Sequence, residues 1–137
     1  MLSKIRAWFT KQRVILLVGD WLTLTLFVVW GQIEHGLLGG DSLLRVLSTT
    51  AVMILPWTVV GLLWGGYRLE AGMGWRLFLG RALTVWLISA PFMLVLRAYL
   101  RGQAVILVIF ILVALAIGGG MMLGWRAIYY WRWLRSA

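Results

Sequence analysis

Four long apolar segments separate the charged residues of this chain and limit what it can fold into. They cover about 14–33, 46–66, 78–97 and 104–125, and each has the length of a helix that crosses a lipid bilayer. Hydrophobic residues make up 63% of the 137 residues, more than a soluble core of this size can enclose, so lipid must cover the remainder. The sequence therefore predicts an all-α integral membrane protein, a single membrane domain with a bundle of four transmembrane helices.

The third segment is the least regular of the four because charged residues lie close to both of its ends. Only 82–96 is free of charge, about 22 Å at the rise of a helix, so Arg81 and Arg97 must extend toward the membrane surfaces. Pro56 and Pro91 lie near the middle of the second and third segments and predict a kink in each helix.

Both ends of the chain combine basic and aromatic residues, which is typical of segments at a membrane surface. In residues 1–13 the apolar side chains share one helical face, so we predict an N-terminal interfacial amphipathic helix. Residues 126–137 are predicted to form a basic aromatic tail among the lipid headgroups.

Lys and Arg are distributed unevenly between the two sides of the predicted bundle. The two ends and the second loop carry ten of the 13, and the first and third loops carry three. Because cytoplasmic segments are enriched in these residues, we expect both termini in the cytoplasm and a multi-pass location in the cell inner membrane. The net charge of +9 thus flanks membrane segments and does not indicate a nucleic-acid partner.

The composition excludes several kinds of cofactor and active site. Without cysteine the chain cannot hold an iron–sulfur cluster through thiolates, and its single histidine rules out a bis-histidine haem within the chain. The sequence shows no hydrolytic triad, paired catalytic carboxylates or nucleotide-binding loop, so we expect no enzyme activity. The candidate ligands that remain are lipid, quinone or a chlorophyll-type pigment.

Asp20 is the one acidic residue inside an apolar segment. It lies on the order of 10 Å along the helix from the cytoplasmic interface, where a bare carboxylate would cost several kcal/mol. We therefore expect it to be paired, protonated or exposed to water, with Arg81 and Arg126 as candidate partners at the same membrane side. The structural interpretation is a buried salt bridge that fixes helix register, and the functional one is a protonatable transport site or a ligand-binding carboxylate.

A second polar group lies near the outer end of the first segment. Glu34, His35 and Asp41 are candidate contacts for a cation, or His35 alone for a pigment metal. The alternative is an ordinary polar helix end before a loop that opens at Gly36.

Glycines four residues apart predict close helix packing in the second and fourth segments. Gly61 and Gly65 form one such pair, and Gly120 and Gly124 form the other. Contacts within the chain are the first interpretation, and a groove for a lipid tail, a pigment or a partner helix is the alternative.

Short motifs in three parts of the chain point to a known family. They are Gly19-Asp20, Phe27, Gly31 and His35-Gly36; Pro56-Trp57 and Gly61; and Pro91, Arg97, Gly102, Phe110 and Gly124-Trp125-Arg126. On these residues the chain resembles an uncharacterised family of bacterial four-helix membrane proteins, a domain of unknown function with the number 3054. The resemblance covers nearly the whole chain and implies four helices in an inner membrane, without an activity. Gln32 departs from the pattern, which has a basic residue there.

Two hypotheses for function follow. The first is a non-catalytic accessory protein or small subunit of a larger membrane complex, which packs against lipids, pigments, other membrane proteins or copies of itself. The alternative is a small oligomeric transporter, coupled to protons or cations, that uses Asp20.

Overall fold

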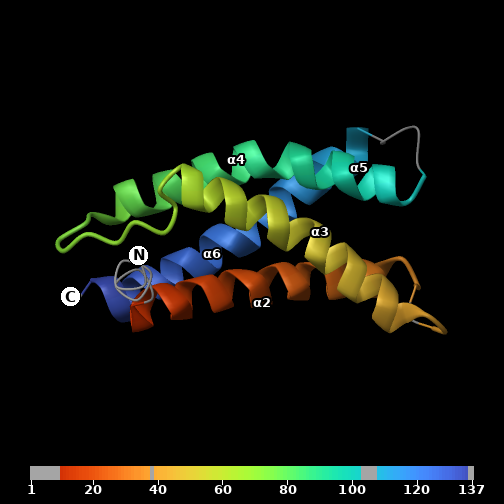
Figure 1. Cartoon of the computed structure of the whole chain (residues 1–137), viewed down its shortest axis with the longest axis horizontal. Helices are drawn as coiled ribbons and strands as arrows, with labels where there is room; N and C mark the ends of the chain where they lie inside the picture. The colour runs from red at the N-terminus through yellow and green to blue at the C-terminus, as the bar shows by residue number, and fades with distance from the viewer. Residues whose placement is uncertain (1–9, 38, 103–107, 136–137) are drawn as a thin grey trace, which may run out of the picture.

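The computed structural model describes residues 10–37, 39–102 and 108–135 (Figure 1). Within these residues the chain forms helices and no strand, and four helical runs are long and apolar enough to cross a membrane. The predicted all-α class and the number of transmembrane helices are thereby confirmed.

Three of the four runs are uninterrupted α-helices, namely α2 (Lys11–Glu34), α3 (Ser42–Leu63) and α4 (Trp75–Leu100). The fourth is continuous from Val108 to Leu134 but alternates α-helical and π-helical turns. Its parts are α5 (Val108–Val113), η1 (Ala114–Gly118), α6 (Gly119–Tyr129) and η2 (Tyr130–Leu134).

The helices continue past the uncharged stretches of sequence. α4 has 26 residues and includes Arg81 and Arg97, so these arginines bound its uncharged middle without ending the helix. The fourth run continues to Leu134, through most of the segment predicted as a basic aromatic tail. Residues 1–9 hold most of the predicted interfacial helix and lie outside the described residues, and α2 begins at Lys11.

The helices pack as a ring of four in which α2 and α4 each contact both α3 and α6 (Figure 1). The start of α2, the connection 64–74 and the end of η2 lie at one end of the bundle, which we call the terminal end. The end of α4 and the start of α5 lie at the opposite end, together with residues 35–37 and 39–41, and we call this the distal end.

Two clusters of aromatic and apolar side chains fill the interior. The central cluster includes Trp57 and Trp86, whose ring centroids are 6.2 Å apart. The terminal cluster includes Phe78 and Tyr129, whose rings stack with their centroids 5.9 Å apart. The Tyr129 hydroxyl donates to the carbonyl oxygen of Gln12 at 2.8 Å and so ties the fourth run to the start of α2.

The four glycines predicted to pack helices have different surroundings. A Cβ at Gly61 would lie 2.6 Å from Cε2 of Tyr67, so this glycine does allow a close contact. Gly65 lies beyond the end of α3 and has a φ of +72°, so it serves the turn. Gly120 and Gly124 face outward, and a Cβ at either position would meet nothing within 4 Å.

Gly118 and Gly119 make the close approach in the fourth run. Both lie against the Trp86 indole, and a Cβ at Gly119 would be 2.7 Å from its Nε1 atom. That Nε1 donates to the Leu115 carbonyl at 3.1 Å, within the π-helical turn η1, so the ring is held and has little freedom to move aside. The contact joins α4 to the fourth run at mid-bundle.

Neighbouring glycines allow this contact to be tested with a matched pair of substitutions. Gly119→Ala should lower the free energy of unfolding by about 1–3 kcal/mol because it overpacks the Trp86 contact. Gly120→Ala should leave it unchanged or raise it by up to about 1 kcal/mol, since alanine favours a helix and its methyl group meets open space. Thermal unfolding in detergent, followed by tryptophan fluorescence, measures both. Equal stabilities of the two variants would contradict the packing described here.

Candidate functional site

The Asp20 carboxylate lies fully buried inside the bundle and accepts five hydrogen bonds. Its Oδ1 atom accepts from Trp125 Nε1 at 3.1 Å and from Arg126 Nε at 3.0 Å. Its Oδ2 atom accepts from Trp57 Nε1 and from the Tyr67 hydroxyl, both at 2.9 Å, and from Arg126 Nη2. The donors come from α3, from the connection after it and from α6, so one carboxylate joins three separate parts of the chain to α2.

Arg126 is also fully buried and is bound through all three of its guanidinium nitrogens. Two of them bind the two oxygens of Asp20, the forked geometry that makes arginine–carboxylate pairs strong. The third, Nη1, donates to the Gly66 carbonyl at 2.6 Å. The rings of Trp57 and Tyr67 lie 5.3 and 5.1 Å from the guanidinium carbon, within the range of cation–π attraction. A cation in this interior is therefore compensated on every side by charge, hydrogen bonds or aromatic faces.

Glycines position the groups around this pair. Gly19 leaves room for the Trp125 indole, which a Cβ at this position would overlap. At the end of α3, Gly65 adopts a positive φ and the Gly66 N–H donates to the Gly61 carbonyl at 2.7 Å, the helix-ending turn that glycine favours. This turn brings the Gly66 carbonyl to Arg126.

Tyr67 follows that turn, outside the helical parts of the spans, and is 2% exposed. Burial and then the negative charge of Asp20 raise the pKa of the Tyr67 phenol well above its usual value near 10, and Arg126 opposes this effect only in part. The phenol therefore remains a hydrogen-bond donor to Asp20 over the physiological pH range.

Of the two arginines predicted as partners of Asp20, the structure brings Arg126 to it and places Arg81 elsewhere. Arg81 binds Glu70 at 3.2 Å, with side-chain exposures of 26% and 58%, and also donates to the Arg68 carbonyl at 3.3 Å. The physical reason is that Arg68 and Glu70, in the connection before α4, both lie within hydrogen-bond distance of Arg81, so its guanidinium is bound at the bundle surface.

The polar residues predicted at the distal end do not converge on one point. The Glu34 carboxylate accepts from Trp30 Nε1 at 3.0 Å, His35 terminates α2, and Asp41 precedes α3 without a side-chain capping bond. Among the described residues, no group of three or more metal-binding side chains could hold an ion.

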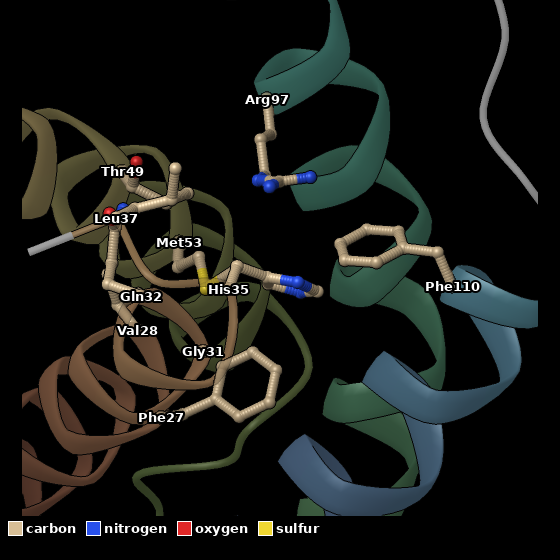
Figure 2. A pocket seen from close by; sticks show the side chains of 10 residues that line it. All are labelled: Phe27, Val28, Gly31, Gln32, His35, Leu37, Thr49, Met53, Arg97 and Phe110. Carbon is tan, nitrogen blue, oxygen red and sulfur yellow. The ribbon is translucent and has the colours of Figure 1, made fainter.

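His35 instead borders a small pocket of about 60 Å³ that the sequence did not indicate, which we call the distal pocket (Figure 2). Its polar lining consists of Gln32, His35, Thr49 and Arg97, and the Phe110 ring closes one side. The Arg97 guanidinium carbon lies 4.6 Å from the centre of the Phe110 ring. Gln32 and His35 lie three residues apart at the end of α2, but Thr49, Arg97 and Phe110 come from three other helices, and no spacing along the sequence links those helices to this pair.

The buried pair should respond differently to single and double substitutions. Asp20→Ala should cost about 3–5 kcal/mol of unfolding free energy, because it leaves the buried Arg126 guanidinium uncompensated. Asp20→Ala with Arg126→Met removes both charges and should cost less than the single change. Equilibrium unfolding in mixed micelles measures both values. The single change Arg126→Met completes the cycle, and a double variant that loses the sum of the two single effects would show that the pair is not coupled.

The raised pKa of Tyr67 predicts a loss of stability in alkaline solution. Above pH about 10 the unfolded chain releases this proton while the folded protein keeps it, so stability falls by at most about 1.4 kcal/mol per pH unit. Tyr67→Phe should be less stable at pH 8, where it lacks a hydrogen bond, and should lose stability less steeply above pH 10. Melting temperatures from pH 8 to 11 test this, with Tyr99→Phe at an exposed tyrosine as the control. Parallel curves for wild type and Tyr67→Phe would contradict it.

Of the comparisons with known proteins, one covers the residues of this site. No curated protein and no solved structure gives a significant match to this chain. One family model does match, described as a protein of unknown function (DUF3054), and it covers residues 17–129. That range includes Asp20 together with all four residues that donate to it. The chain belongs to the DUF3054 family of uncharacterised proteins.

Proposed function

We propose that this protein is a non-catalytic membrane protein that serves as an accessory or small subunit of a larger membrane complex. The observation that carries the proposal is the set of hydrogen bonds that the Asp20 carboxylate already accepts from within the protein. Asp20 lies inside α2, accepts five hydrogen bonds and is fully buried, so its role is to hold the helices together. A carrier that used Asp20 would have to break these bonds to admit water or a cation.

The outward face of α6 is the surface that we assign to a partner. Gly120 and Gly124 lie four residues apart with open space above both, and the exposed Ile117 and Ile128 extend this face at either end. A partner helix could approach the α6 backbone closely at the two glycines and pack against the two isoleucines. The opposite side of α6 is occupied by α2 and α4.

The proposal includes an orientation in the membrane. By their places in the described helices and connections, basic residues gather toward the terminal end, namely Lys11, Arg13, Arg68, Arg76, Arg81, Arg132 and Arg135, and three lie toward the distal end, namely Arg45, Arg97 and Arg101. Together with the bias over the full sequence, this supports a terminal end in the cytoplasm and the cell inner membrane as the location.

Copurification from the native membrane tests the proposal with a matched control. We expect the tagged wild-type protein to retain an integral membrane protein in constant ratio, and Gly120→Leu with Gly124→Leu to reduce its recovery at least tenfold. Gly80→Leu should retain it, because Gly80 is also an outward helical glycine with no atom within 4 Å of its Cβ position. All three forms should have similar melting temperatures, since each leucine points away from the bundle.

Two results would contradict this assignment. One is a wild-type protein that is isolated with no partner other than copies of itself. The other is equal recovery of the partner by the Gly80→Leu variant and the double glycine variant. Proton-coupled flux in liposomes that is lost in Asp20→Asn would instead support the carrier.

A further inference from the structure

Gln32 presents an unsatisfied polar atom inside the protein. The residue is 4% exposed, and among the described residues its Oε1 atom has no hydrogen-bond partner. A buried carbonyl oxygen without a donor destabilises the folded protein. Because Gln32 lines the distal pocket, a ligand with a hydroxyl or amine donor could satisfy this atom there.

Arg97 gives the same pocket a positive charge. Its guanidinium is half-buried and stacks on Phe110, and it forms no ion pair with a described residue. A second guanidinium, that of Arg101, donates to Thr49 in the pocket wall at 3.0 Å. Figure 2 shows the Arg97 guanidinium and the rings of His35 and Phe110 directed toward one another. The pocket therefore favours an anionic group.

An apolar groove of about 580 Å³ adjoins the pocket and shares Phe27, Gly31, His35 and Phe110 with it. The groove continues along the fourth run from Ile109 to Ile117, about 12 Å toward the middle of the bundle. Its remaining lining is apolar apart from Glu34, whose carboxylate accepts from Trp30 at the rim. A volume of this size is in the range of sites for ligands that are largely apolar.

The polar pocket and the apolar groove that leads from it match the polar headgroup and the apolar acyl chain of a phospholipid. The polar pocket lies at the distal helix ends, at the depth of the headgroups, and the groove leads from it toward the hydrocarbon. We propose that this site binds one anionic phospholipid with a hydroxyl-bearing headgroup, such as phosphatidylglycerol. Arg97 and His35 bind the phosphate, Gln32 accepts from a headgroup hydroxyl, and an acyl chain lies in the groove.

The pocket holds several water molecules by volume, which is enough for a headgroup phosphate but not for a macrocyclic pigment. A zwitterionic choline headgroup would bring a cation toward Arg97 and offers no hydroxyl to Gln32. The site should therefore discriminate between phospholipids by headgroup rather than by acyl chain.

Native mass spectrometry of the detergent-solubilised full chain tests the proposal, with phosphatidylglycerol and phosphatidylcholine of the same chain length as probes. Wild type should bind one phosphatidylglycerol at least tenfold more tightly than phosphatidylcholine. Arg97→Gln and Gln32→Leu should each reduce phosphatidylglycerol binding at least tenfold. Arg45→Gln should not, although it also removes an arginine at the distal end, because Arg45 does not line the pocket.

Melting temperatures and a soluble probe separate the remaining explanations. Gln32→Leu should melt at or above the wild-type temperature without lipid, since it removes an unsatisfied buried oxygen, so lost binding cannot be ascribed to misfolding. Equal binding of the two lipids, or equal losses in Arg97→Gln and Arg45→Gln, would overturn the proposal. Displacement of the lipid by millimolar glycerol 3-phosphate would overturn it too, because the site would then recognise a free anion without help from the groove.

Discussion

The ion pair between Asp20 and Arg126 is the interaction on which the arrangement of the four helices depends. Desolvating two charges in a membrane interior costs several kcal/mol for each, and the attraction between them offsets this only when the remaining polar atoms are also satisfied. Here the Asp20 carboxylate also accepts hydrogen bonds from Trp57, Tyr67 and Trp125. The Arg126 guanidinium donates its remaining hydrogen bond to the Gly66 carbonyl. Because lipid tails compete with apolar contacts between helices, such directional bonds decide which of many apolar packings is adopted.

The two ends of the bundle use their polar groups in opposite ways. At the terminal end the buried charges are matched with each other, and the rings of Phe78, Tyr129 and Tyr130 pack beside them. At the distal end Gln32 Oε1 and the Arg97 guanidinium border a cavity, and no described residue bonds the first or pairs with the charge of the second. The matched charges at the terminal end hold the helices in place. The polar groups at the distal pocket remain able to bind a molecule from outside the chain. The two roles therefore do not compete for the same residues.

The sequence predicted the class of fold, and it predicted that Asp20 must be paired, protonated or exposed to water, because both follow from the free energy of burying residues in lipid. The sequence named two arginines as candidate partners of Asp20 but could not choose between them. The choice depends on the ion pair that Arg81 forms with Glu70. Trp57 and Tyr67 could not be identified as donors because indole and phenol groups are common at membrane surfaces. The distal pocket was equally hidden, because packing alone brings its helix ends together.

The separation of the ion pair along the chain bears on how the protein is made. Asp20 belongs to the first of the four described spans in chain order, and Arg126, 106 residues later, belongs to the fourth. Of the four residues that donate to Asp20, Trp57 and Tyr67 are therefore synthesised before this fourth span, and Trp125 and Arg126 are synthesised as part of it. The Asp20 carboxylate thus gains its charged partner and its full set of donors only after all four of these spans have been synthesised.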